Sequence, residues 1–334
     1  MTASPTTQKT PRLVWPDLLR GLAMLAILYD HTEIYYTGGN VVPYNLYVAN
    51  ALTAFFFVSG FFFKPTDPSA GRLQALRHKL RSIVLRLLLP YFLFTAALSL
   101  PKAFYYGEPW QDYAWSILTG QASWFIAALI VASLCFALLL YACRGSHRVL
   151  AAVSLLSFGA AMALSGQFDS LWWKADIALL ALPLLYLGYA YRCCAGRVDR
   201  LLNGRSLPVL LLLFIGIKVC VHAADVEMLI CPLRIGSVWV FAVDTLVGIA
   251  LLTCLTKLLE KHAHQLRLLA WTGSHSLVYY FLCGAVPLTL SLLFTRLGFG
   301  YDGSAWRVLA AFALVYAVST LAVWPIYRYL LRWM

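Results

Sequence analysis

The stretch LVWPDLLRGLAMLAILYDHTEIY, residues 13–35, contains the features that decide how this chain folds. It is a long apolar run, and it exceeds the roughly 20 residues that a helix needs to cross a bilayer. It shows no clear small-residue cleavage site, so we read it as a retained span rather than a secretory signal. Two of its polar residues, Arg20 and His31, are eleven positions apart. At about 100° per residue, both fall on one helix face, about 16 Å apart along the axis.

The remainder of the chain repeats this apolar pattern. Hydrophobic residues make up 61% and charged residues 12% of its 334 residues, with a mean hydropathy of +0.75. A soluble domain is nearer half apolar and a quarter charged. We therefore predict an all-α integral membrane protein, a bundle of about ten transmembrane helices. The predicted spans are 13–35, 45–63, 82–100, 122–142, 149–166, 175–191, 206–222, 236–256, 273–294 and 306–327.

The segments between the spans complete the predicted organisation. We expect a cytoplasmic tail over residues 1–12 and a single polytopic domain over 13–334. The segment 223–235 is predicted to contain a re-entrant or interfacial piece. Lys218 and Asp244 fall at intramembrane depth in successive spans and are expected to pair.

The distribution of positive charge predicts the orientation. The net charge is +12, but the basic residues lie in loops rather than on a nucleic-acid-binding face. Eighteen of the 26 lysines and arginines fall in alternate loops, whereas five fall in the opposite loops. Because cytoplasmic loops carry the excess of lysine and arginine, both termini are predicted to be cytoplasmic. Nucleic acid is not an expected partner, and the oligomeric state cannot be predicted from the sequence.

The Arg20 and His31 pair suggests a chemistry. A guanidinium near the cytoplasmic end suits phosphates, and an imidazole deeper on the same face suits a general base. A long, thin donor such as a coenzyme A thioester fits that spacing. The alternative is that Arg20 anchors the helix at the interface while His31 is a hydrogen-bonded core histidine. Asp30 is rotated by about 100° from His31, so we expect it to orient the imidazole only if the helix end is distorted.

Several motifs resemble the membrane acyltransferase-3 family, whose members O-acylate sugars and other cell-envelope glycans. The likeness covers most of the chain, although Cys283 stands where family members often carry a histidine. The strongest motifs are DLLRG at 17–21 running to His31, FFFVSGF at 55–61, and RLLLPY at 86–91. Weaker likenesses are SWF at 123–125 and GSHSLVY at 273–279.

The resemblance implies a short sugar O-acetyltransferase in the bacterial cytoplasmic membrane. It would use acyl-CoA, most simply acetyl-CoA, as donor, a sugar or glycan as acceptor, and no metal. His31 would be the general base, or would itself be acylated before transfer. The implied donor site is Arg20, Ser59, Gly60, Lys64, Arg81 and Arg86. The implied acceptor site is Glu33, Tyr35 and Trp124, the last either a platform for a sugar ring or an interfacial belt tryptophan.

The sequence leaves two other functions open. A transporter or flippase for a lipid-linked or small polar solute needs polar residues along a path through several spans. This chain concentrates its polar residues in the first span and at the cytoplasmic rim, which disfavours transport. A catalytically inactive scaffold is disfavoured because both Arg20 and His31 are present.

Overall fold

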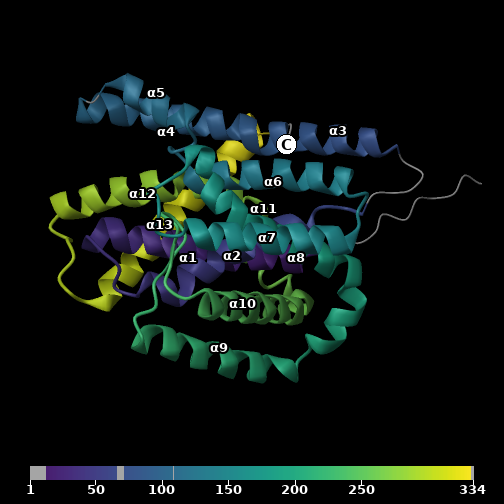
Figure 1. Cartoon of the computed structure of the whole chain (residues 1–334). Helices are drawn as coiled ribbons and strands as arrows, with labels where there is room; N and C mark the ends of the chain where they lie inside the picture. Colours follow the sequence, from purple (N-terminus) through teal and green to yellow (C-terminus); the bar gives the residue numbers. More distant parts are fainter. Residues whose placement is uncertain (1–12, 66–70, 108, 332–334) are drawn as a thin grey trace, which may run out of the picture.

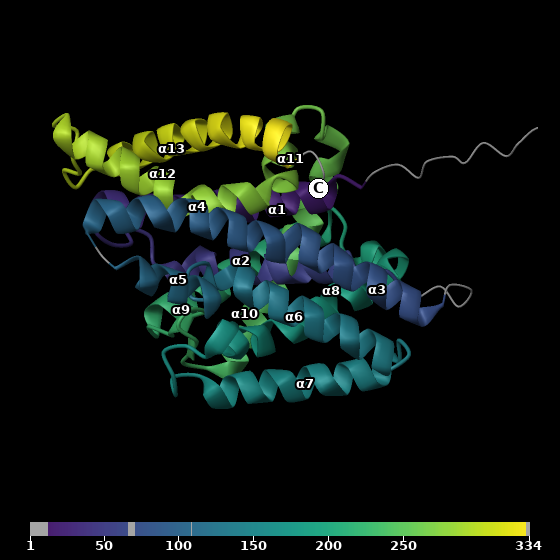
Figure 2. The ribbon, with the colours of Figure 1, turned by 90° about the horizontal axis from the view of Figure 1, so that it is seen from above.

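The computed structural model describes residues 13–65, 71–107 and 109–331, so the predicted tail over residues 1–12 lies outside the described residues. Long helices pack into one bundle with α1 and α2 at its centre (Figures 1 and 2). Helices α3 and α4 follow one another along one side of the bundle, and α9 lies at the opposite side (Figure 1). The helices are α1 (Trp15–Thr37), α2 (Tyr44–Phe61), α3 (Arg72–Ile83), α4 (Leu89–Tyr106), α5 (Trp110–Leu118), α6 (Trp124–Ala142), α7 (His147–Leu164), α8 (Ala175–Leu201), α9 (Ser206–Ala223), α10 (Val238–Leu259), α11 (Arg267–Ser274), α12 (Ser276–Arg296) and α13 (Ala305–Pro325).

Short segments connect these helices. The only strands in the described part of the chain form an antiparallel hairpin, in which Met228 pairs with Ile235. This hairpin occupies the segment 223–235, which was predicted to hold a re-entrant or interfacial piece. The short segments are η1 (Val84–Leu88), η2 (Trp172–Lys174), η3 (Glu260–His262), η4 (Ile326–Leu330), β1 (Met228–Leu229) and β2 (Arg234–Ile235).

Each of the ten predicted spans coincides with a helix in the expected order. Eight helical segments among the described residues are long and apolar enough to cross a membrane, which confirms an all-α, multi-pass membrane protein. The central helices α1 and α2 are outside these eight. Helix α1 carries four charged residues, and most residues of both helices are buried in the bundle. A helix enclosed by protein does not need an apolar surface. The count of ten and the cytoplasmic termini stay predictions.

Helix α3 was not predicted, because its sequence looks like a basic loop. Its apolar residues nevertheless recur at helical spacing, with Leu76, Leu80 and Ile83 on one face. That face packs against the core, and α3 contacts α6. Of the charged residues between them, Arg77 and Arg81 are exposed, whereas Lys79 is half-buried over the Phe63 ring. The segment extends the helix that enters the membrane.

Two glycines let the central helices touch backbone to backbone. A Cβ added at Gly273 of α11 would lie 1.7 Å from the carbonyl oxygen of Asp17 in α1. A Cβ added at Gly60 of α2 would lie 2.0 Å from the carbonyl oxygen of Leu185 in α8. Small residues permit such close approach between helices in a membrane. The two contacts fix α11 against α1 and α8 against α2.

Replacing Gly273 with alanine is expected to destabilise the bundle by about 1–3 kcal/mol or more, because the methyl group overpacks a backbone contact. The Tm of the purified protein in detergent measures this effect. Gly159 in α7 is the matched control, since a Cβ there would meet nothing within 4 Å. Gly159→Ala should leave Tm unchanged or slightly raised. Equal Tm values for the two variants would contradict the close α1–α11 packing.

The predicted pairing of Lys218 with Asp244 is confirmed. The Lys218 Nζ of α9 lies 2.8 Å from Oδ1 of Asp244 in α10. Asn50 of α2 donates a second hydrogen bond to Asp244 through its Nδ2, at 2.9 Å from Oδ2. The pair therefore joins three helices inside the bundle.

Candidate active site

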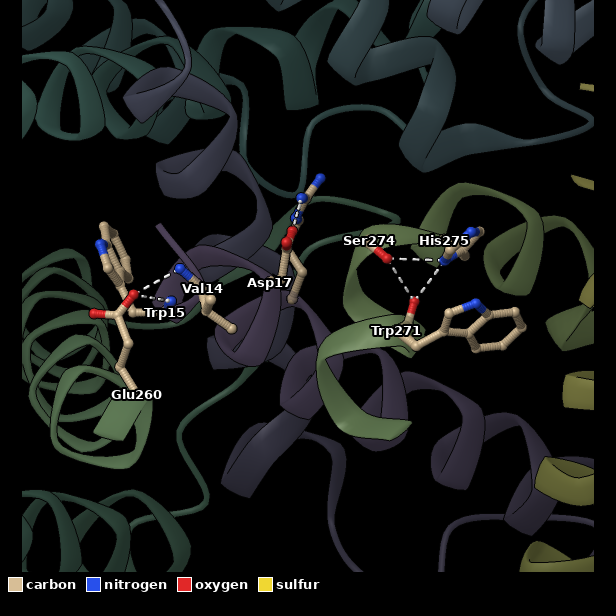
Figure 3. A network of polar contacts seen from close by, with 8 residues as sticks. Val14, Trp15, Asp17, Glu260, Trp271, Ser274 and His275 are labelled. Atoms are coloured by element: carbon tan, nitrogen blue, oxygen red, sulfur yellow. Dashed lines mark hydrogen bonds and ion pairs between the residues drawn. The ribbon is translucent and has the colours of Figure 1, made fainter. Parts of the chain in front are cut away.

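Helix α1 carries the candidate site, and its start is fixed by a residue distant in sequence. Glu260 accepts hydrogen bonds from the backbone N–H groups of Val14, at 2.6 Å, and Trp15, at 3.1 Å (Figure 3). N–H groups in a first helical turn lack partners within the helix, so this carboxylate caps α1. From there α1 continues without interruption to Thr37. Arg20 and His31 are therefore about 16 Å apart on one face, as the sequence predicts.

His31 is oriented by the residue that precedes it. Its Nδ1 lies 3.3 Å from Oδ2 of Asp30, whose other oxygen accepts a 2.6 Å hydrogen bond from Asn40. The expectation that this contact requires a distorted helix was wrong, because α1 is continuous and the side chains alone bridge the angle. An Nδ1–H donated to Asp30 leaves Nε2 free to accept a proton. The His31 side chain is 30% exposed, so it is not enclosed by the surrounding helices.

Helix α12 packs against the part of α1 that carries His31. Cys283 is buried and close enough to the His31 imidazole for the two groups to interact. A Cβ added at Gly284 would lie 3.7 Å from the hydroxyl oxygen of Tyr35. Tyr35 is exposed, and its ring lies edge-on to His31 at a centroid distance of 6.5 Å. Residues 283–284 of α12 thus lie beside residues 31–35 of α1.

The remaining predicted acceptor residues occupy different surroundings. Glu33 is fully buried and accepts hydrogen bonds from the Val42 N–H, at 3.2 Å, and the Tyr47 hydroxyl, at 3.3 Å. It holds the connection between α1 and α2 and, unlike His31, is not accessible from outside the bundle. Trp124 begins α6 and is half-buried.

The start of α6 is tied to α12. The Phe125 N–H donates a 3.2 Å hydrogen bond to the hydroxyl of Tyr280. Tyr280 lies one turn before Cys283. This contact brings the start of α6, with Trp124, toward the His31 region.

At the other end of the site, three consecutive phenylalanines at the end of α2 each carry a cation from a different helix. Arg192 of α8 lies 5.2 Å above the Phe61 ring, and Arg20 of α1 lies 5.1 Å above Phe62. Lys79 of α3 lies 3.6 Å above Phe63. Such cation–π contacts hold charged groups in place without neutralising them. The sequence analysis gave Arg192 no role.

These three side chains lie on consecutive phenylalanines, and Arg86 lies near Lys79. We call the four residues the cationic cluster: Arg20, Lys79, Arg86 and Arg192. Arg86 is exposed and close enough for its charge to act on Lys79. It lies in the π-helical segment η1, where the Leu89 N–H bonds the carbonyl of Val84. Pro90 explains the wider turn, since it has no N–H to donate to the Arg86 carbonyl.

The cluster has little negative charge to balance it. Arg20 pairs with Asp17, yet its buried Nε has no hydrogen-bond partner among the described residues. Within the same part of the chain, no ion pair involves Lys79, Arg86 or Arg192. Buried donors and unpaired cations are suited to an anion such as a phosphate.

Of the other predicted donor residues, Ser59 and Gly60 face protein, whereas two basic residues are exposed. Ser59 donates a 2.8 Å hydrogen bond to the Phe55 carbonyl, in its own helix. Gly60 faces the α8 backbone, so its small size is explained by helix packing rather than by a ligand. Lys64 and Arg81 are exposed.

His275 lies at the break between α11 and α12. Its Nδ1 is 2.8 Å from both the Ser274 hydroxyl and the Trp271 carbonyl (Figure 3). Tyr327 packs edge-on to the His275 ring, with the ring centroids 4.2 Å apart. Its hydroxyl is also close enough to Arg20 for the two groups to interact electrostatically. The GSHS motif therefore packs beside the Arg20 end of the site.

These features define a polytopic membrane protein with a polar site built on its central helix. The family model described as an acyltransferase domain, acyltransferase family 3, matches residues 13–328. The chain belongs to this membrane acyltransferase-3 family, which confirms the resemblance found in its motifs and implies membrane acyl transfer. Searches of the curated proteins and of the solved structures return no match.

Proposed function

We propose that this protein moves an acyl group, most simply acetyl, from cytosolic acyl-CoA to a hydroxyl of a sugar or cell-envelope glycan. The observation that carries the proposal is the pairing of Arg20 and His31 on one continuous, central helix. The first residue belongs to the cationic cluster and lies over the Phe62 ring, and Asp30 holds the second. We place the enzyme in a bacterial cytoplasmic membrane, with residues 13–334 as one domain and both termini in the cytoplasm.

The donor would bind with its phosphates at the cationic cluster. Guanidinium groups bind phosphate oxygens through paired, charge-assisted hydrogen bonds, and Lys79 adds a point charge. The exposed Lys64 and Arg81 would strengthen the positive field at the entrance. From there, the thin pantetheine arm would extend along α1 over about 16 Å toward His31.

At the far end, His31 would act as the general base. Its Nε2 takes the proton of the acceptor hydroxyl, the oxygen attacks the thioester carbonyl, and the coenzyme A thiolate leaves with a proton. The Asp30 carboxylate stabilises the imidazolium that forms during the reaction. Tyr35 and Trp124, at the borders of this region, would contact the sugar.

Replacing Arg20 with glutamine should weaken acetyl-CoA binding by about 10–100-fold, because each hydrogen bond to a charged group contributes about 1.5–3 kcal/mol. Equilibrium binding of labelled acetyl-CoA to the protein in nanodiscs measures the change. Arg148→Gln is the control, since Arg148 is an exposed arginine outside the cluster. Equal affinity in the two variants would reject Arg20 as a donor ligand.

The overall proposal is tested by reconstituting the protein in liposomes with labelled acetyl-CoA and envelope glycans. Transfer of label to the glycan supports acyltransfer. Movement of an unmodified lipid-linked or polar solute, with no acyl transfer, would instead support the transporter alternative.

A further inference from the structure

Cys283 differs in its surroundings from an ordinary buried cysteine. It is 4% exposed and close enough to the His31 imidazole for the two groups to interact. The next residue, Gly284, brings α12 against α1 here, because a Cβ added to it would lie 3.7 Å from the Tyr35 hydroxyl oxygen. Its Sγ also donates a 2.9 Å hydrogen bond to the Tyr280 carbonyl, within its own helix. The imidazole is in turn 3.3 Å from Asp30. A carboxylate, an imidazole and a thiol therefore follow one another across α1 and α12.

We propose that Cys283 is the nucleophile that first accepts the acyl group, with His31 as its base. This inference rests on the proposed function and specifies its chemical route. A nucleophile beside a base that a third group orients is the arrangement that produces covalent catalysis. A cysteine suits this role because its thiol loses a proton far more readily than a hydroxyl.

The first half of the reaction transfers the acyl group to sulfur. The imidazole nitrogen that does not face Asp30 takes the proton from the Cys283 thiol. The thiolate attacks the carbonyl carbon of acyl-CoA, and a new S–C bond forms as the bond to the coenzyme A sulfur breaks. The departing coenzyme A thiolate takes the proton from His31, so free coenzyme A leaves and an acyl-Cys283 thioester remains.

The second half transfers the group to the acceptor. The acceptor hydroxyl gives its proton to His31, and its oxygen attacks the thioester carbonyl. Cys283 leaves as a thiolate and takes the proton back. The donor and the enzyme intermediate are both thioesters, so the first half exchanges one such bond for another and needs no oxidant or reductant.

The imidazole and the thiol differ in their exposure. The imidazole is 30% exposed, whereas Cys283 is 4% exposed. The donor and the acceptor would thus reach the sulfur along the edge of the imidazole. Limited access for water protects a thioester from hydrolysis until an acceptor arrives.

An exchange reaction without any acceptor tests the inference. Full-length protein in liposomes is incubated with acetyl-CoA and labelled free coenzyme A. An acyl-enzyme lets the label enter acetyl-CoA, whereas direct transfer does not. We expect exchange in the wild type, at least a 100-fold loss in Cys283→Ala, and an acetyl group on the Cys283 peptide by mass spectrometry. Cys254→Ala is the matched control, because Cys254 is a buried helical thiol that also contacts a backbone carbonyl, that of Asn203.

Each alternative result has a separate meaning. Exchange that persists in Cys283→Ala, or an acetyl group found on His31, would overturn the inference and leave acyltransfer intact. Acyl transfer to envelope glycans by the wild type with no exchange would do the same, in favour of the direct route. Neither exchange nor transfer by the wild type would overturn both proposals. If Cys283→Ala fails to fold, as judged by its elution profile and acetyl-CoA binding, the mass of the wild-type peptide decides.

Discussion

Replacing His31 with glutamine is expected to lower acyl transfer by about 10²–10⁴-fold, the usual contribution of a positioned general base. Glutamine keeps an N–H that can face Asp30, but it cannot take a proton at neutral pH. The side chain is 30% exposed, so the change should leave the fold and the yield of protein unaffected. Acetyl-CoA binding should stay near that of the wild type, because the cationic cluster lies about 16 Å away.

The measurement is transfer of labelled acetyl from acetyl-CoA to envelope glycans in liposomes. His264→Gln provides the comparison, since His264 is an exposed histidine outside the site. Transfer by His31→Gln at the rate of His264→Gln would remove His31 from the reaction. Parallel binding measurements separate a lost chemical step from a lost donor site.

The Arg20–His31 pair could be predicted from the sequence because it depends only on helical phase. The phase calculation holds since α1 is one continuous helix capped by Glu260. The Lys218–Asp244 pair could be predicted for a related reason, because two ionisable groups inside adjacent spans have few other partners. Both predictions follow from local geometry and the physics of the bilayer.

The contacts between distant helices could not be predicted in the same way. Cys283 meets His31 only because α12 packs beside α1, and a single sequence does not define that packing. The cationic cluster depends equally on tertiary contacts, because Arg192, Arg20 and Lys79 come from three helices.

The glycines show a different limit of sequence reasoning. A glycine in a motif predicts close approach to something, but not to what. For Gly60 the sequence suggested a ligand, and the structure shows the backbone of α8.

Replacing Lys218 with methionine is expected to destabilise the protein by about 3–5 kcal/mol, the range found when one partner of a buried ion pair is removed. Asp244 is 1% exposed, so its carboxylate would be left without its cation inside the bundle. The free energy of unfolding in detergent measures the loss. Lys261→Met, at an exposed position in η3, should change it by less than about 0.5 kcal/mol.

The double variant Lys218→Met with Asp244→Asn separates stability from function. Asparagine removes the uncompensated charge and can still accept the hydrogen bond from Asn50, so most of the lost stability should return. If this pair only joins α2, α9 and α10, the stable double variant should transfer acetyl at the wild-type rate. A transporter that uses the pair as part of a polar path would instead lose its activity in the double variant, however well the protein folds. A stable but inactive double variant would therefore count against a purely structural role for Lys218 and Asp244.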